Sequence, residues 1–375
     1  MKLAILSQGF PPDKYSGGVG RYYSELINEL KKKTEEIHVF TSIERKNEEN
    51  VFFHLVKNER KFVPLINNYF NSVNYSKKVF KELNRFKKKI DFVEAPLAML
   101  NSYYYSENKF APLISSVQTP LSEIVGKKNL FSDKKLIYAL EKKILKNSDK
   151  IVTASNYSKE FIVNKYFKIK NENIITINQG INTDKFKPIK SIKLINEPNL
   201  ILFIGRIEPR KGLKVLIQAI PLIKQKTKII VISENLDQNT PYHKEIMELI
   251  KKNSIKNIDF LGFLPEENLI EVYNKADLIV EPSFSESACY VLIEAMACSK
   301  PVIASNIGGM KEISLKELQF QSGNYIELAE KINFLLENKK TLNKLGKKSR
   351  EKIVKEHNIK KSAKDYIKLY SSLKN

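Results

Sequence analysis

Short apolar runs alternate with amphipathic segments along most of this chain, and the alternation restricts the possible folds more than any other feature of the sequence. The runs are rich in Ile, Leu and Val, whereas apolar residues in the longer segments recur at the spacing of a helical face. Such alternation is typical of βαβ units, in which helices connect parallel strands. The pattern predicts strands at residues 2–6, 37–41, 51–56, 90–95, 113–117, 150–154, 174–177, 200–204, 228–232, 258–261, 278–281 and 302–304.

The number of predicted strands sets the domain organisation. One ordinary doubly wound sheet does not hold so many strands, so the 375 residues are expected to form two Rossmann-like α/β domains. Residues 182–199 are polar, carry two prolines and have weak periodicity, which favours a boundary there. We expect one domain over residues 1–185, a second over 196–350, and a single terminal helix over 349–373. The helices predicted between strands include 21–33, 74–89, 134–146, 213–224, 266–274 and 291–298.

The composition excludes several classes of protein. The formal net charge is +22, yet the excess of cations is spread over both halves without a nucleic-acid motif, so nucleic acid is not an expected partner. Phosphorylated substrates or an anionic lipid surface suit this charge better. The longest run of large apolar residues, 200–204, is far shorter than a transmembrane helix, and we expect no signal peptide. Because Cys289 and Cys298 lack the spacing of metal ligands, a reduced, cytoplasmic chain is expected.

Two groups of residues follow predicted strands, where ligands collect in open α/β sheets. Gly17 and Gly18 precede a helix in the first half, and glycines let the backbone approach a ligand closely. Arg206 follows the apolar run at 200–204, and Lys211 comes just before the next helix. These cations could hold a diphosphate, Arg206 by paired hydrogen bonds and Lys211 as a point charge. A flexible turn and two surface cations are equal alternatives on position alone.

Two carboxylates follow the predicted strand at 278–281. Glu286 lies in a polar loop before a helix expected to begin near residue 288, and Glu294 lies inside that helix among Ala and Met residues. A carboxylate in so apolar a helix needs a partner, because an unpaired buried charge is costly. The hydroxyls of a sugar or ribose would serve, and so would an ion pair with a neighbouring lysine. Backbone N–H groups of Ala288, Cys289 and Tyr290 could bind a phosphate.

Taken together, these residues belong to ordered blocks that resemble the retaining glycosyltransferases of the GT-B fold, glycosyltransferase family 4. The resemblance covers most of the chain and is strongest over residues 200–312. The blocks are E-x7-E at Glu286 and Glu294, G-R with K-G at 205–206 and 211–212, F-L-G-F-L-P at 260–265, P-V-I-A-S at 301–305, G-G at 308–309, F-P-P and G-G-V-G within 10–20, S-D-K-I-V-T-A-S at 148–155, and N-Q-G-I-N with F-K-P within 178–188.

The resemblance implies two Rossmann-like domains, with the terminal residues 351–375 returning to the first, and a nucleotide-diphosphosugar donor such as a UDP- or GDP-sugar. Arg206 and Lys211 would neutralise the diphosphate, Glu294 would bind the ribose hydroxyls, and Glu286 would contact the donor sugar. In this family the leaving phosphate is thought to accept the acceptor's proton, which gives retention. No Asp-x-Asp occurs in the sequence, so we expect no metal and no cofactor besides the nucleotide sugar.

Further contacts follow from the same resemblance. The backbone of Phe263 and Leu264 would read the base, and the amides of residues 288–290 would assist at the donor. Gly17 and Gly18 would approach the phosphates or the acceptor from the first domain.

The chain departs from the family at Gln118, where many members have a His that contacts the donor sugar. Glutamine still donates and accepts hydrogen bonds but does not titrate. Gln118 therefore either tunes the choice of donor or marks a weaker or inactive site. A non-catalytic nucleotide- or glycan-binding homologue and a nucleotide-sugar epimerase of the same fold are the alternatives to a hexosyltransferase of cell-surface polysaccharide or glycoconjugate synthesis.

The sequence gives fewer indications of the residues that bind the acceptor. Residues 60–70 are apolar and aromatic with flanking cations, and the helix at 74–90 has a lysine-rich face. Such a segment is consistent with contact to the inner face of a membrane or with a core-packed helix whose lysines face solvent. The acceptor is expected to be a glycan, a lipid-linked molecule or a small molecule, and the protein a monomer or homodimer.

Overall fold

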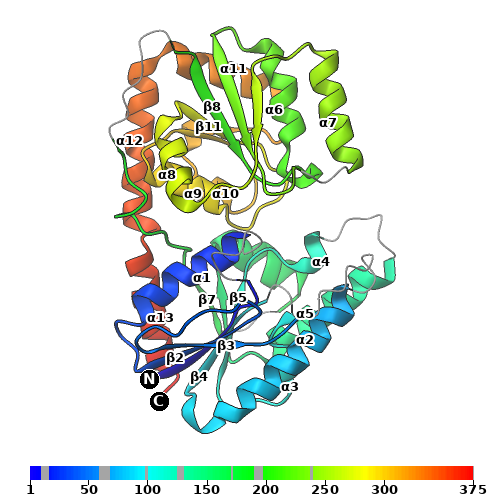
Figure 1. The fold of residues 1–375 in the computed structure, drawn as a ribbon, viewed down its shortest axis with the longest axis vertical. Helices are drawn as coiled ribbons and strands as arrows, with labels where there is room; N and C mark the ends of the chain where they lie inside the picture. Colours follow the sequence, from blue (N-terminus) through cyan, green and yellow to red (C-terminus); the bar gives the residue numbers. More distant parts are fainter. Residues whose placement is uncertain are drawn as a thin grey trace. The chain divides into compact units, whose positions relative to one another are not determined.

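The computed structural model describes residues 1–9, 17–58, 68–97, 100–124, 131–169, 172–189, 197–236 and 240–374. The chain divides into two units, one formed by Met1–Gly180 with Ile359–Asn375 and the other by Ile181–Asn358. Each unit is an α/β domain built on its own sheet of parallel strands (Figure 1). The predicted doubly wound α/β architecture is therefore confirmed.

The first unit contains a seven-stranded sheet of order β3-β2-β1-β4-β5-β6-β7. Its strands are apolar and mostly buried, as expected where helices cover both faces of a parallel sheet. The strands are β1 (Lys2–Leu6), β2 (Glu36–Thr41), β3 (Val51–Leu55), β4 (Phe92–Pro96), β5 (Leu113–Val117), β6 (Lys150–Thr153) and β7 (Ile174–Thr176). The helices are α1 (Gly17–Leu30), α2 (Asn68–Leu83), α3 (Tyr103–Glu107), α4 (Leu121–Ile124), α5 (Phe131–Asn147) and α13 (Ile359–Ser372), with a 3-10 turn at Asn84–Lys89 and a π-helix at Ser158–Tyr166.

The second unit contains a six-stranded sheet of order β10-β9-β8-β11-β12-β13. Its strands are β8 (Asn199–Ile204), β9 (Thr227–Ile232), β10 (Ile258–Leu261), β11 (Leu278–Glu281), β12 (Val302–Ser305) and β13 (Gln319–Phe320). The α-helices are α6 (Leu213–Ala219), α7 (Pro241–Lys252), α8 (Glu266–Lys275), α9 (Tyr290–Ala297), α10 (Met310–Ile313), α11 (Tyr325–Glu337) and α12 (Lys339–Glu356), with 3-10 turns at Pro209–Lys211, Ile220–Leu222 and Lys316–Leu318.

The terminal residues differ from the single helix predicted over 349–373. The structure has two helices there, α12 and α13, separated at His357 and Asn358. Asn358 forms a parallel bridge with Ile181, whose N–H donates to the carbonyl of His357 at 2.8 Å. This pairing takes the backbone out of the helix, so α12 ends in the second unit and α13 begins the return to the first.

Helix α13 then packs against α1 within the first unit (Figure 1). Tyr366 and Tyr370 are fully buried on its inner face, and the ring of Tyr370 stacks on Phe92 of β4. The start of α13 also lies close to Gly180, where a side chain would not fit, because a Cβ there would lie 2.6 Å from the backbone of Ile359.

Candidate functional site

The second unit places two neighbouring strands where its sheet order reverses. β8 lies between β9 and β11, so the chain leaves β8 toward one side and later returns to β11 on the other (Figure 1). In open α/β sheets, ligands bind beyond the carboxyl ends of strands at such a reversal. The loops that follow β8 and β11 carry Arg206, Lys211 and Glu286.

A glycine brings these two loops together. Gly212 has a positive φ of 69° and separates the 3-10 turn Pro209–Lys211 from α6. A Cβ at this position would lie 2.0 Å from the carbonyl oxygen of Pro282 in the loop after β11. Both the conformation and the space therefore require glycine, and the turn before it is held directly against the second loop.

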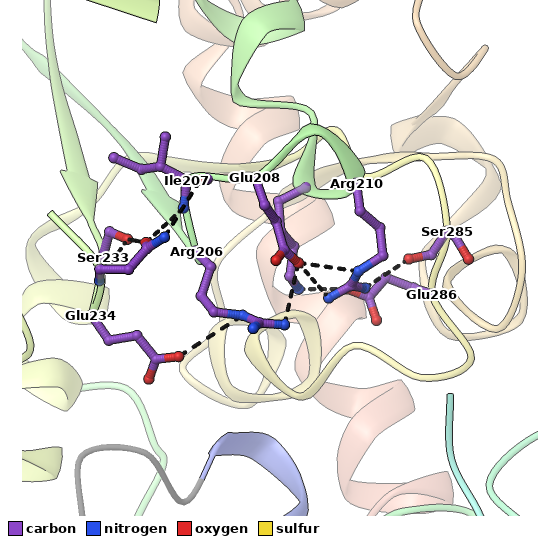
Figure 2. Close-up of polar contacts among 10 residues, drawn as sticks. Arg206, Ile207, Glu208, Arg210, Ser233, Glu234, Ser285 and Glu286 are labelled. Carbon is purple, nitrogen blue, oxygen red and sulfur yellow. Dashed lines mark hydrogen bonds and ion pairs between the residues drawn. The ribbon is translucent and has the colours of Figure 1, made fainter. Parts of the chain in front are cut away.

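Glu286 is the centre of the contact between the two loops. Its side chain is 6% exposed. Its Oε1 accepts hydrogen bonds from Lys211 Nζ at 2.5 Å and from Arg210 Nη1 at 2.9 Å. Arg210 also donates to the carbonyl of Ser285 at 3.0 Å (Figure 2). Two partly buried cations thus share one buried carboxylate.

The charges of this cluster stabilise one another. Burial alone would raise the pKa of the Glu286 carboxyl, but the cations of Lys211 and Arg210 outweigh it and hold that pKa below its usual value. Burial would likewise lower the pKa of Lys211, whereas Glu286 and the neighbouring acids raise it to about 12. Glu286 is therefore anionic and Lys211 cationic at neutral pH.

A further buried carboxyl lies next to this cluster. Glu281, at the end of β11, is fully buried, and its pKa is raised to about 8 by burial despite the nearby charge of Lys211. The thiol of Cys289 lies 3.7 Å from Glu281 Oε2. Burial and the same carboxyl raise the pKa of that thiol well above its usual value, so Cys289 is a neutral, unreactive thiol.

Arg206 is the more accessible cation, with 43% of its side chain exposed. It lies between two carboxylates, 3.3 Å from Glu208 Oε1 and 3.9 Å from Glu234 Oε1 (Figure 2). Glu208 also accepts two hydrogen bonds from Arg210. The edge of the sheet thus carries a row of alternating charges in which the most exposed cation, Arg206, lies between two carboxylates.

Glu294 is buried in α9 at 0% exposure. Its Oε2 accepts a hydrogen bond of 2.7 Å from the hydroxyl of Tyr273 in α8. Glu294 thus has a neutral hydrogen-bond donor from a neighbouring helix. Helix α9 begins at Tyr290, between the two starts expected from the sequence, near residue 288 and at residue 291, and Cys289 is its N-cap.

The remaining predicted residues of the second unit lie around these groups. Phe263 follows β10 and is 50% exposed. Ala288, Cys289 and Tyr290 form the start of α9, where Cys289 and Tyr290 are buried. Leu264 is half-buried just before α8.

Three predicted residues belong to the first unit. Gly17 and Gly18 lie in the first turn of α1, which begins four residues before the predicted start. Gly17 has a φ of 59° and open space around its Cβ position. Gln118 follows β5, and its Nε2 donates to Ser116 Oγ at 3.0 Å. The segments 10–16 and 60–67, which the sequence analysis also singled out, lie outside the described residues.

Sequence reasoning missed Arg210, Glu208 and Glu234. The dense run of charges at residues 206–211 was the available signal for the first two. Glu234 gave no signal, because its proximity to Arg206 arises from the pairing of β9 with β8. Among the described residues, no three His, Cys, Asp or Glu side chains are grouped so as to hold a metal ion. No helix within those ranges is long and apolar enough to cross a bilayer.

Two family models match this chain. The model described as "Glycosyltransferase Family 4" matches residues 16–185, and the model described as "Glycosyl transferases group 1" matches residues 184–352. Together with the two parallel sheets, these matches define the protein as a GT-B glycosyltransferase. The chain belongs to glycosyltransferase family 4.

Similar proteins agree with this assignment. An uncharacterized glycosyltransferase of Methanocaldococcus jannaschii is 29% identical over 94% of this chain and 93% of its own length. The O-antigen chain mannosyltransferase B of Escherichia coli is 27% identical over 44% of this chain and 45% of its own length.

Two solved structures share the fold. Sucrose-phosphate synthase from Thermosynechococcus elongatus has a TM-score of 0.88 at 21% identity and covers 100% of this chain and 99% of that one. Anabaena HepE in complex with UDP-glucose has a TM-score of 0.77 at 18% identity, over 99% and 100% of the two chains.

Proposed function

We propose that this glycosyltransferase is a retaining, metal-independent hexosyltransferase that moves a sugar from a nucleotide-diphosphosugar to an acceptor hydroxyl. The observation that carries the proposal is the pair of partly buried cations, Lys211 and Arg210, on Glu286 at the carboxyl edge of β8 and β11. A diphosphate leaving group needs positive charge at such an edge, and protein cations can supply it in place of a metal.

The proposed reaction gives separate roles to Arg206, Lys211 and Glu286. In the transfer, the bond between sugar C1 and the diphosphate oxygen breaks, and a bond from C1 to the acceptor oxygen forms on the same face. The acceptor's proton passes to the leaving phosphate, so no protein base is required. Arg206 and Lys211 stabilise the diphosphate as negative charge grows on it, and Glu286 faces the positive charge that develops on the sugar.

The remaining assignments concern recognition. Glu294 accepts hydrogen bonds from the ribose hydroxyls in place of some of the hydrogen bonds that it accepts in the structure. The backbone of Phe263 and Leu264 reads the base, and the amides of Ala288, Cys289 and Tyr290 support the donor. In the first unit, Gly17 and Gly18 approach the phosphates or the acceptor, and Gln118 contacts the donor sugar.

The names of similar proteins support the choice of donor. Anabaena HepE binds UDP-glucose, and the relative from E. coli is a mannosyltransferase. A UDP- or GDP-linked hexose therefore fits this chain, with a glycan, lipid-linked or small-molecule acceptor in cell-surface polysaccharide or glycoconjugate synthesis.

A thermal-shift panel tests the donor site. We expect one of UDP, GDP, ADP or CDP, or its sugar conjugate, to raise the melting temperature by several degrees at a hundred times its Kd. Arg206→Ala should abolish most of the shift, because it removes the exposed cation of the site. Arg45→Ala, which removes a guanidinium paired with Glu48 in the first unit, is the control and should leave the shift intact. An equal shift in wild type and Arg206→Ala would contradict the assigned role of Arg206.

The carboxylates beside Arg206 should restrain nucleotide binding. Glu234 is 3.9 Å from the Arg206 guanidinium and offsets part of its charge. Glu234→Gln is therefore expected to tighten binding of the nucleoside diphosphate about three- to fivefold at low salt. Titration calorimetry at two salt concentrations measures the change. Glu245→Gln, whose carboxylate pairs with Lys214, is the matched control. Unchanged affinity in Glu234→Gln would show that this carboxylate does not act on the site.

A further inference from the structure

The first unit contains a buried carboxyl that the transfer reaction does not use. Glu94 lies in β4 at 0% exposure, with Ile5 and Ile114 as its neighbours on the adjacent strands. The hydroxyl of Tyr23 in α1 donates to its Oε1 at 2.9 Å, and that of Tyr370 in α13 donates to its Oε2 at 3.3 Å. A polar group this deep in a core requires such partners.

Tyr23 connects this carboxyl to a second set of polar groups. Its hydroxyl oxygen lies 2.5 Å from Ser116 Oγ in β5, and Ser116 Oγ accepts from Gln118 Nε2 at 3.0 Å. Ser116 is 3% exposed and Tyr23 is fully buried. A continuous chain of hydrogen bonds therefore runs from Glu94 through two hydroxyls to the side-chain amide of Gln118.

The order of the hydrogens in these hydrogen bonds is set when Glu94 is ionised. Tyr23 then gives its one hydroxyl hydrogen to the Glu94 carboxylate, so Ser116 is the donor in its contact with Tyr23. The oxygen of Ser116 is then left to accept from the Gln118 amide. The Gln118 carbonyl oxygen, Oε1, has no hydrogen-bond partner among the residues that the structure describes. A buried acceptor without a partner costs about 1–3 kcal/mol.

We propose that Glu94 is a positioning residue that, through Tyr23 and Ser116, orients the Gln118 amide so that its Oε1 accepts a hydrogen bond from a hydroxyl of the donor sugar. The inference rests on the proposed function, which places Gln118 at the donor sugar. It adds that Gln118 acts there as an acceptor, and that the element fixing it is a carboxyl in the core of the first unit.

The charge of Glu94 gives the chain a pH-dependent property. The titratable groups that face it are Tyr22 and Tyr23 of α1 and Tyr366 and Tyr370 of α13. Burial raises the pKa of all four phenols, so they stay neutral at ordinary pH. Burial also raises the pKa of Glu94 to about 8, although tyrosine hydroxyls partly counteract it. Ionisation of Glu94 therefore strengthens the hydrogen bond that it accepts from the Tyr23 hydroxyl, while the four phenols remain neutral.

The chain of hydrogen bonds from Glu94 to Gln118 can be tested without any ligand, through the NMR signals of the Gln118 side-chain amide. These signals are identified in NMR spectra of the full protein by their loss in Gln118→Leu. We expect them to shift between pH 6.5 and 9.5 with a midpoint near 8 in wild type, and to stay constant in Glu94→Gln. Tyr23→Phe and Ser116→Ala should each move the signals at pH 7, because each breaks the chain.

The matched control is Tyr370→Phe. It removes a hydroxyl from the same carboxyl at the same burial, but it does not touch Ser116. Its Gln118 signals should stay in place. Equal shifts in Tyr23→Phe and Tyr370→Phe would indicate general loosening and overturn the proposal, as would unchanged signals in both Tyr23→Phe and Ser116→Ala.

An activity measurement then separates this inference from the proposed function. Ser116→Ala is expected to lower turnover of UDP-glucose or GDP-mannose about tenfold with the Kd of the nucleoside diphosphate unchanged. Moved amide signals with full turnover would overturn the role of the chain at the donor sugar. Wild-type protein without turnover of either donor, but with the expected amide shifts, would contradict the proposed donor class and leave the hydrogen-bond chain established.

Discussion

Glu286→Gln is expected to lower glycosyl transfer by about a hundred- to a thousandfold while changing the Kd of the nucleoside diphosphate less than threefold. The carboxylate is buried between Lys211 and Arg210, and the proposed mechanism turns it toward positive charge that exists only during transfer. Gln keeps the size and one acceptor oxygen, whereas Ala would leave two partly buried cations without their carboxylate. A loss in turnover therefore reports on the charge itself.

Glu294→Gln is the matched comparison, since both residues are buried carboxylates on the loop and helix that follow β11. It is expected to weaken nucleotide binding about tenfold, because one ribose contact loses its charge. Calorimetry with UDP and GDP, together with donor turnover at saturating nucleotide sugar, distinguishes the two residues. Equal losses of nucleotide affinity in both variants would refute this division of roles.

Glu94→Gln is expected to stabilise the protein at alkaline pH relative to wild type. The pKa of Glu94 is about 8 in the folded chain against an ordinary value of 4.5. Between those values the folded state holds one more proton than the unfolded state, so wild-type stability falls by about 1.4 kcal/mol per pH unit from this residue. Its contribution is complete below about pH 4.5 and is lost as the pH rises through 8.

Urea unfolding of wild type and Glu94→Gln at pH 5.5, 7 and 8.5 measures this effect. The difference between the two proteins should shift toward the variant by roughly 3–4 kcal/mol across that range. Glu330→Gln, which removes an exposed carboxyl from α11, is the control and should run parallel to wild type. A pH-independent difference between Glu94→Gln and wild type would show that Glu94 does not bind this proton.

The strands were predictable because each is a short run rich in Ile, Leu, Val or Phe between more polar segments. β1, β5, β10 and β11 have the predicted bounds. β4 begins two residues later and ends one residue later than predicted, and the other predicted strands differ by one residue at one end. β13 was missed because it has two residues, which is too short for any periodic pattern. The break between α12 and α13 was missed because it depends on pairing with Ile181, a contact distant in sequence.

The candidate site was predictable in part for a similar reason. Arg206, Lys211, Glu286 and Glu294 were singled out by their positions after predicted strands, and the resemblance to family 4 implied their roles, but neither gave any geometry. Which cations reach Glu286 is decided by the 3-10 turn and by Gly212, so the role of Arg210 beside Lys211 appears only in three dimensions. Glu94 was interpreted as part of an apolar strand, since its tyrosine partners lie far away in the sequence.

The return of α13 to the first unit has a consequence for biosynthesis. This helix is translated after the whole of the second unit. Translation proceeds at roughly 5–20 residues per second, so about 10–35 seconds pass between synthesis of the first part of this unit, with α1 and β4, and synthesis of α13. During that interval the groove that later receives Tyr366 and Tyr370 is uncovered, and nascent chains are open to capture by chaperones or neighbouring polypeptides. The first unit is thus completed only after the second unit has been translated.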